Sequence, residues 1–144
     1  MEKSKIFFEN DSACVYYDEN LDALFLQYKS KVKTMDEFIL INGSVVQAFK
    51  QLNTTNLIAD IRKMGIISLD AQDWVLNNLF PPVLEHLNGK KLFHAQLLDP
   101  SEIMSKVAAS NLRKKTSAIG FTIEQFGDEQ SLIEKLQSLK KPMV

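Results

Sequence analysis

The sequence lacks most of the motifs that mark an enzyme or a cofactor-binding protein. Cys14 is the only cysteine among 144 residues, so no disulfide forms within the chain and no thiolate metal cluster is available. The five glycines are scattered singly, which excludes the glycine-rich loops that hold dinucleotides and nucleotide phosphates. No G-x-S-x-G nucleophile elbow is present. We therefore expect no metal, no cofactor and no enzymatic activity of the common classes.

Long apolar runs and a strong net charge are also missing. No segment approaches the roughly 20 apolar residues that a membrane-spanning helix requires, and Met1 to Asn10 carries no signal-peptide core. Hydrophobic residues still make up 45% of the chain and charged residues 24%, with a net charge of −1. This balance is typical of a globular domain that has no global attraction for nucleic acid. We expect one domain, residues 1–144, in a reducing cytoplasm, with no membrane span and no nucleic-acid partner.

The first part of the chain predicts an antiparallel β-region. Asn10-Asp11-Ser12 and Asp18 to Asn20 are typical turn segments. In the third candidate strand one face carries Leu24, Leu26 and Tyr28, and the other carries alternate residues from Ala23 to Gln27. The three predicted strands are Ile6–Glu9, Ala13–Tyr17 and Asp22–Tyr28.

The rest of the chain alternates helices with strands. Thr34 to Glu37 has the pattern of a capping box, in which each end of the motif bonds the other, and apolar residues follow at helical spacing from Phe38 to Leu52. Pro81-Pro82 should kink or split the next helix, and Asn88-Gly89 should end it. Further strands are predicted at Leu57–Ile61, Lys91–Leu98 and Gly120–Phe126, and further helices after the caps Ser68, Asp99 and Asp128.

This order of elements predicts the fold class. Three strands are followed by alternating helices and strands, which favours right-handed crossovers onto one sheet. We expect an α/β fold with a mixed β-sheet, N-terminal antiparallel strands and about four packed helices.

The histidines, the cysteine and the basic clusters have simple structural interpretations. His86 and His94 lie in different predicted elements, and Cys14 lies in an apolar strand, where a buried inert thiol is the ordinary case. Three basic clusters are present: Lys29, Lys31 and Lys33 before the first long predicted helix, Arg113 to Lys115 at the end of the third, and Lys140 and Lys141 at the end of the fourth. The last two end helices, where the helix dipole favours positive charge.

One corner of the predicted fold is the candidate interaction or regulatory site. Ligands of open α/β folds gather outside the carboxyl ends of strands, and five polar or aromatic residues lie around that end of the Leu57–Ile61 strand. Each also has a local interpretation as a cap, a dipole partner, a surface charge or a core residue, and this is favoured for any one of them alone. The five residues are Asp60, Arg62, Ser68, Asp70 and Trp74.

Several of these segments carry a family resemblance. They are Leu57–Arg62, Ser68–Trp74, Phe80-Pro81 and Gly120-Phe121. With the order of elements, they resemble the uncharacterised bacterial STAS/SEC14-like proteins, often called SpoIIAA-like. The resemblance implies the STAS fold of the anti-sigma-factor antagonists. It covers most of the chain by topology and only these segments by motif.

The resemblance also points to one segment that is regulatory in the antagonists. The antagonists carry Asp-Ser-Ser-Gly at the start of the helix after the central strand, and a kinase phosphorylates a serine there. The matching stretch here reads Ser68-Leu69-Asp70-Ala71, with Asp70 in place of the second serine. Phosphate at a helix N-terminus is well placed, so Ser68 stays a candidate acceptor, but its role as a cap is the stronger interpretation.

Two functional hypotheses follow. The first is a non-enzymatic regulatory or protein-interaction module that docks a partner through Met64 to Leu79. The second, suggested by the SEC14-like resemblance, is a small apolar-ligand or lipid-binding protein. That reading needs a cavity lined by residues that would equally well fill the core, namely Phe38, Phe49, Trp74 and Phe80.

An enzyme and a self-associating protein are the remaining alternatives. Asp60, Asp70 and Asp73 are carboxylates without a convergent partner set, so catalysis is the least favoured reading. A homodimer is compatible with either leading hypothesis, because aromatic residues near a sheet edge invite pairing. These aromatic residues are Phe7, Phe8, Tyr16 and Tyr17.

Overall fold

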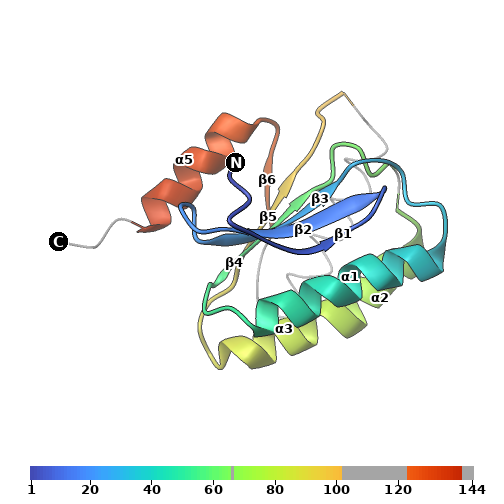
Figure 1. Cartoon of the computed structure of the whole chain (residues 1–144), viewed down its shortest axis with the longest axis horizontal. Coiled ribbons are helices and arrows are strands. Elements are labelled where there is room, and N and C mark those ends of the chain that lie inside the picture. The colour runs from blue at the N-terminus through green and yellow to red at the C-terminus, as the bar shows by residue number, and fades with distance from the viewer. Residues whose placement is uncertain (66, 102–122, 141–144) are drawn as a thin grey trace.

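A mixed β-sheet lies between two helical layers (Figure 1). The computed structural model describes residues 1–65, 67–101 and 123–140. Its six strands lie side by side in chain order, with β1 to β3 antiparallel and β3 to β6 parallel, which confirms the predicted α/β fold with antiparallel N-terminal strands. The strands are β1 Lys5–Glu9, β2 Ala13–Asp18, β3 Ala23–Tyr28, β4 Asn56–Asp60, β5 Phe93–Leu97 and β6 Ile123–Phe126.

The helices occupy both faces of the sheet. Those described are α1 Met35–Lys50, the continuous run of α2 Leu69–Trp74, η1 Val75–Leu79 and α3 Phe80–Leu87, and α5 Glu129–Lys140. Figure 1 places α1, α2 and α3 on one side of the sheet and α5 on the other. The described residues thus hold three helical segments where about four were predicted. The predicted helix after Asp99 falls almost wholly outside them.

The two prolines do not split the second helical segment, contrary to one of the two predicted outcomes. Pro81 lacks an N–H, and its ring would crowd the carbonyl four residues earlier in an α-helix. The turn before it widens instead into the π-helical turn η1, in which the Phe80 N–H donates to the carbonyl of Val75. Asn88 and Gly89, with φ of 51° and 90°, end the segment as predicted.

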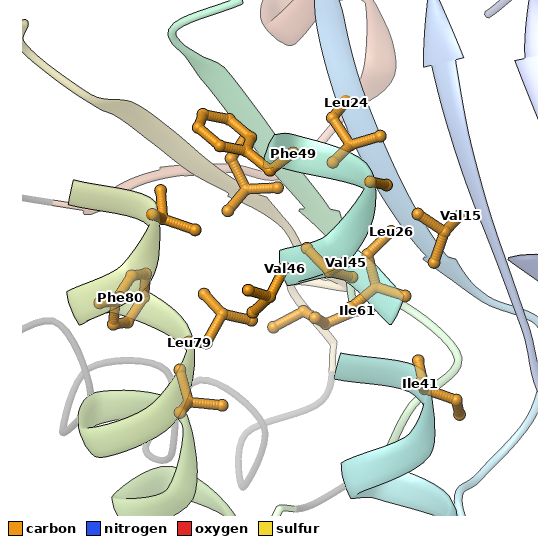
Figure 2. Close-up of a cluster of buried hydrophobic side chains, with 14 of the residues drawn as sticks. Val15, Leu24, Leu26, Ile41, Val45, Val46, Phe49, Ile61, Leu79 and Phe80 are labelled. Carbon is orange, nitrogen blue, oxygen red and sulfur yellow. The ribbon is translucent and has the colours of Figure 1, made fainter. Parts of the chain in front are cut away.

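Alternation along the strands buries both faces of the sheet. Leu24, Leu26 and Tyr28 belong to the core under α1 and α3, whereas Ala23 and Phe25 belong to the core under α5, as the sequence predicted. Figure 2 shows side chains of α1, of η1 and α3, and of β2 and β3 meeting in the first of these cores. No helix of the described segments is both long and apolar enough to span a bilayer.

Side-chain caps set where the helices begin. The Thr34 hydroxyl accepts from the Glu37 N–H at 3.1 Å, which confirms the first half of the capping box. The second half was predicted wrongly, because the Glu37 carboxylate accepts a hydrogen bond from the Ser12 hydroxyl at 2.8 Å and so ties α1 to the β1–β2 turn. The predicted cap at Asp128 is confirmed by a bond from the Ser131 N–H at 2.8 Å.

Candidate functional site

The loops that leave the carboxyl ends of β3 and β4 lie against each other. Gly65 has a φ of +81°, a backbone conformation that glycine adopts without strain. A Cβ built on Gly65 would be 3.2 Å from Cγ of Lys31, so the aliphatic part of the Lys31 side chain lies on the glycine. The backbone conformation therefore favours glycine here, and a side chain at this position would have to displace Lys31 slightly.

Between these loops is an open hollow of about 630 Å³, which we call the basic groove. Lys29 pairs with Glu9 at 3.1 Å, at the edge of the groove. Lys31 and Lys63 are exposed and make no hydrogen bond or ion pair with any residue of the described segments. The groove is lined by Lys29, Ser30, Lys31, Val32, Arg62, Lys63, Met64 and Gly65. It thus presents two unpaired cations at the carboxyl ends of parallel strands, where α/β folds commonly bind ligands.

Asp60 and Arg62 form a brace between the sheet and the last helix. Asp60 is 3% exposed, and Arg62 donates to both of its carboxylate oxygens, from Nε at 2.9 Å and from Nη2 at 2.7 Å. The same Nη2 donates to Oε1 of Glu129 in α5 at 2.9 Å. Hydrogen bonding to Asp60 is the main cause that raises the pKa of the Arg62 guanidinium. A bidentate pair of this kind satisfies a buried carboxylate, so both residues have a structural role.

Ser68, Asp70 and Trp74 lie on the helix that covers the opposite face. The Ser68 hydroxyl accepts from the Ala71 N–H at 3.1 Å, and Asp70 is exposed in the first turn. The half-buried Trp74 ring meets the Phe38 ring edge to face, with centroids 6.5 Å apart. Within the described segments no hydrogen bond, ion pair or ring contact joins these three residues to Asp60 or Arg62. The five predicted site residues therefore surround one end of β4 without converging.

A second hollow, of about 200 Å³, adjoins the basic groove between the first turns of α1 and α2. We call it the apolar pocket. It shares Val32 and Met64 with the groove. Its polar rim consists of Lys33, Thr34 and Ser68, and its apolar walls are Val32, Met35, Phe38, Met64, Ile67 and Ala71. The groove and the pocket are thus adjacent hollows that share one wall.

The internal cavity needed for a lipid-binding function is small. A hollow of about 50 Å³ lies between the sheet and the helices, and its lining includes Phe38 and Phe80 but neither Phe49 nor Trp74. A cavity that binds benzene has a volume of about 150 Å³. Phe49 instead packs against His86, with ring centroids 5.7 Å apart. In the part of the chain that the structure describes, this space is smaller than a lipid chain requires.

The two histidines and the cysteine are held in structural positions. His94 Nδ1 lies 2.7 Å from the Leu57 carbonyl oxygen, and desolvation by burial lowers the pKa of His94 to about 4, so the ring is neutral. His86 Nε2 lies 2.8 Å from the Leu52 carbonyl oxygen. Burial raises the pKa of the Cys14 thiol, which disfavours a nucleophilic thiolate. Nowhere in the described ranges do three His, Cys, Asp or Glu side chains gather to hold a metal ion.

The free edge of β1 has features that oppose strand pairing. Tyr16 is only 2% exposed and stacks on Phe25, and the Tyr17 hydroxyl donates to Asp22 at 2.7 Å. The register of β1 shifts between Ile6 and Phe8. Short, lysine-bearing and bulged edge strands pair poorly with other chains. A homodimer through this edge stays a prediction.

Of the residues that line the groove, only Arg62 was among the five predicted site residues, and the contact of Arg62 with Glu129 was also missed. Lys31 was visible as part of a basic cluster directly after a strand, which was a usable signal. Lys63, Gly65 and Glu129 carried none, because their roles depend on contacts across loops or, for Glu129 and Arg62, across 67 positions of the chain.

Comparisons with protein-family models, with curated proteins and with solved structures find no match to this chain. The resemblance to STAS/SEC14-like proteins therefore stays a prediction from the sequence, and the function is argued from the geometry of the site.

Proposed function

We propose that this chain is a non-enzymatic interaction module that docks an acidic segment of a protein partner in the basic groove. The observation that carries the proposal is an open groove of about 630 Å³ with two exposed cations, Lys31 and Lys63, that have no partner among the described residues. Clefts lined by charge of one sign concentrate ligands of the opposite sign and accelerate their association.

The state of the polar groups around the groove supports a binding role without catalysis. Asp60 is paired with Arg62, and the Ser68 hydroxyl accepts from the Ala71 N–H as a helix cap. Acid–base catalysis needs a base within reach of a reacting group, and these groups already have partners in the fold.

The composition of the groove favours a peptide over a nucleic acid. Single-stranded nucleic acids are bound by cations together with aromatic side chains on which bases stack. The described lining of the groove contains no aromatic side chain, and the net charge of the chain is −1. Carboxylates of an extended acidic segment need only the positive charge and the open shape.

The proposal is tested by fluorescence anisotropy with a labelled peptide of glutamate and glycine residues at low ionic strength. The double variant Lys31→Ala/Lys63→Ala should bind at least tenfold more weakly than wild type, and added salt should weaken wild-type binding. The matched control is Lys90→Ala/Lys91→Ala, which removes two exposed lysines at the other end of the sheet. Equal losses in both double variants, or tighter binding of a single-stranded oligonucleotide than of the peptide, would contradict the proposal.

A further inference from the structure

We infer that the acidic partner segment carries one apolar side chain next to its carboxylates, and that this side chain enters the apolar pocket. The inference rests on the proposed function and names the specificity of the same site. Its basis is that the two hollows are adjacent and share Val32 and Met64 as a common wall. A segment that lies along the groove therefore has the pocket within reach of a neighbouring side chain.

The chemistry of the pocket selects an apolar group. Its two rim hydroxyls lie at the exposed mouth, where Thr34 accepts from the Glu37 N–H and Ser68 from the Ala71 N–H. Phe38 is 5% exposed and Ala71 is also 5% exposed, so the pocket ends on the hydrophobic core. A polar side chain placed against Phe38 and Ala71 would lose its water without gaining a partner from their side chains.

The size and the wall residues of the pocket suit one side chain. A volume of about 200 Å³ accommodates a single branched or aromatic group. Met35 and Met64 line it, and methionine is the side chain that adapts most readily to ligands of different shape. Protein interfaces generally concentrate their binding energy in such anchors, with charged contacts at the rim.

The opening of the pocket has further apolar surface beside it. Leu69 follows the cap Ser68 directly and is 64% exposed, the largest value among the big hydrophobic side chains described. Exposed leucines are ordinary when isolated, but this one adjoins the pocket through Ser68. The backbone of the partner next to its anchor would cover it.

The test compares three labelled peptides of equal charge. The first has a central leucine among glutamates and glycines, the second has alanine there, and the third has the leucine at one end, away from the glutamates. Burying a leucine side chain should make the first peptide bind about tenfold more tightly than the second. The third should bind like the second, because its anchor cannot reach the pocket while its carboxylates occupy the groove.

Two variants locate the anchor in the pocket. Ala71→Met should reduce the affinity of the leucine peptide to that of the alanine peptide, because the longer side chain fills the space. Ile67→Ala should enlarge the pocket and shift the preference from leucine to tryptophan. The control Leu40→Ala removes an exposed leucine from the outer face of α1 and should change neither affinity. Thermal melts establish that each variant folds.

The outcomes separate this inference from the proposed function. If the leucine and alanine peptides bind equally, and both lose binding in Lys31→Ala/Lys63→Ala, the inferred apolar anchor is rejected. The proposed binding of acidic segments in the basic groove is then retained. If no acidic peptide binds, the proposed function itself fails and the anchor fails with it. If octanoate displaces the leucine peptide at concentrations where acetate does not, the pocket takes small amphipathic anions, and the peptide anchor is overturned.

Discussion

The two ends of the parallel strands differ in whether their polar groups have partners within the chain. At the amino end Thr54 and Asn56 both donate to the Asp22 carbonyl, at 2.6 Å and 2.8 Å, and His86 lies against the Leu52 carbonyl. At the carboxyl end Lys31 and Lys63 extend into the basic groove without a partner in the described segments. The amino end satisfies its buried polar groups by hydrogen bonds within the chain, whereas the carboxyl end gathers exposed lysines at an open groove.

This difference separates residues that stabilise the fold from residues that are available to a partner. A buried polar group without a hydrogen bond destabilises a protein, so the amino end has to satisfy its own groups. An exposed lysine has no such requirement, because water solvates it. Changes at the amino end should therefore lower stability and leave peptide binding intact, whereas changes to the unpaired lysines should do the reverse.

The largest expected effect is a loss of stability on acidification, through His94 in the amino half of β5. The pKa of His94 is about 4 in the folded protein and about 6.5 in the unfolded chain. Above pH 6.5 both states are neutral at this residue, so it adds no pH dependence. As the pH falls from 6.5 towards 4, only the unfolded chain takes up the proton, and the free energy of unfolding should fall by about 1.4 kcal/mol per pH unit.

Urea unfolding at several pH values in that window measures this slope. The variant His94→Gln removes the titrating group and keeps a donor near the Leu57 carbonyl, so its slope should be shallower than that of wild type. An unchanged slope in the variant would show that other groups dominate acid unfolding.

Removal of the Asp60–Arg62 brace should have the next largest effect on stability. It also qualifies the comparison, because Arg62 lies at the carboxyl end of the strands and still has a structural role. Arg62→Ala leaves the buried Asp60 carboxylate unpaired, and we expect a loss of about 2 kcal/mol, since the partial exposure of Arg62 lets water replace some of the contact. The neighbouring Lys63→Ala should change stability by less than about 0.5 kcal/mol. Chemical denaturation of both variants measures the difference, and equal losses would refute it.

Loss of one hydrogen bond at the amino end should have a smaller effect. Asn56→Ala removes the 2.8 Å bond to Asp22 but leaves the Thr54 bond in place, so we expect a loss of about 1.5 kcal/mol. Asn53→Ala, at an exposed position of the preceding loop, is the control and should be nearly neutral. Affinity for the acidic peptide should be the same in both variants, and a weakened affinity in Asn56→Ala would undo the separation of the two ends.

The smallest expected change in stability is at Gly65. Gly65→Ala forces a side chain into the left-handed region and towards Lys31, which should cost about 1 kcal/mol. The displaced Lys31 should also lower the affinity for the acidic peptide a few-fold. Gly43→Ala in α1 meets no atom within 4 Å and should raise the thermal midpoint instead. If both substitutions stabilise, the close approach of the two loops is not required.

Local patterns predicted much of the fold because each had a local physical cause. The alternation from Leu24 to Tyr28 placed β3 and both of its faces, and the caps at Thr34 and Ser68 placed the starts of two helices. The π-turn before Pro81 was not predicted, because sequence shows that proline disrupts a helix but not how the backbone compensates.

The candidate site was predicted from its place at the end of the central strand, and its contacts were not predicted. Asp60 ends β4 and Arg62 follows it, but the role of the pair depends on Glu129, which is remote in the chain. Likewise, Lys31 and Lys63 become neighbours only through the packing of two loops. Contacts of this kind depend on the tertiary arrangement, and a single sequence has no periodic signal for them.

The position of α5 has a consequence during synthesis. Leu132 and Leu136 are fully buried in the core that also contains Phe25 and Ile58, and both arrive late in the chain. A ribosome that has translated β1 to β5 presents this face of the sheet before α5 has been made. During that interval the nascent chain exposes apolar strands that chaperones or other nascent chains can bind. A message truncated before the codon for Glu129 would release a polypeptide with this face uncovered, which is a substrate for aggregation and for quality-control proteases.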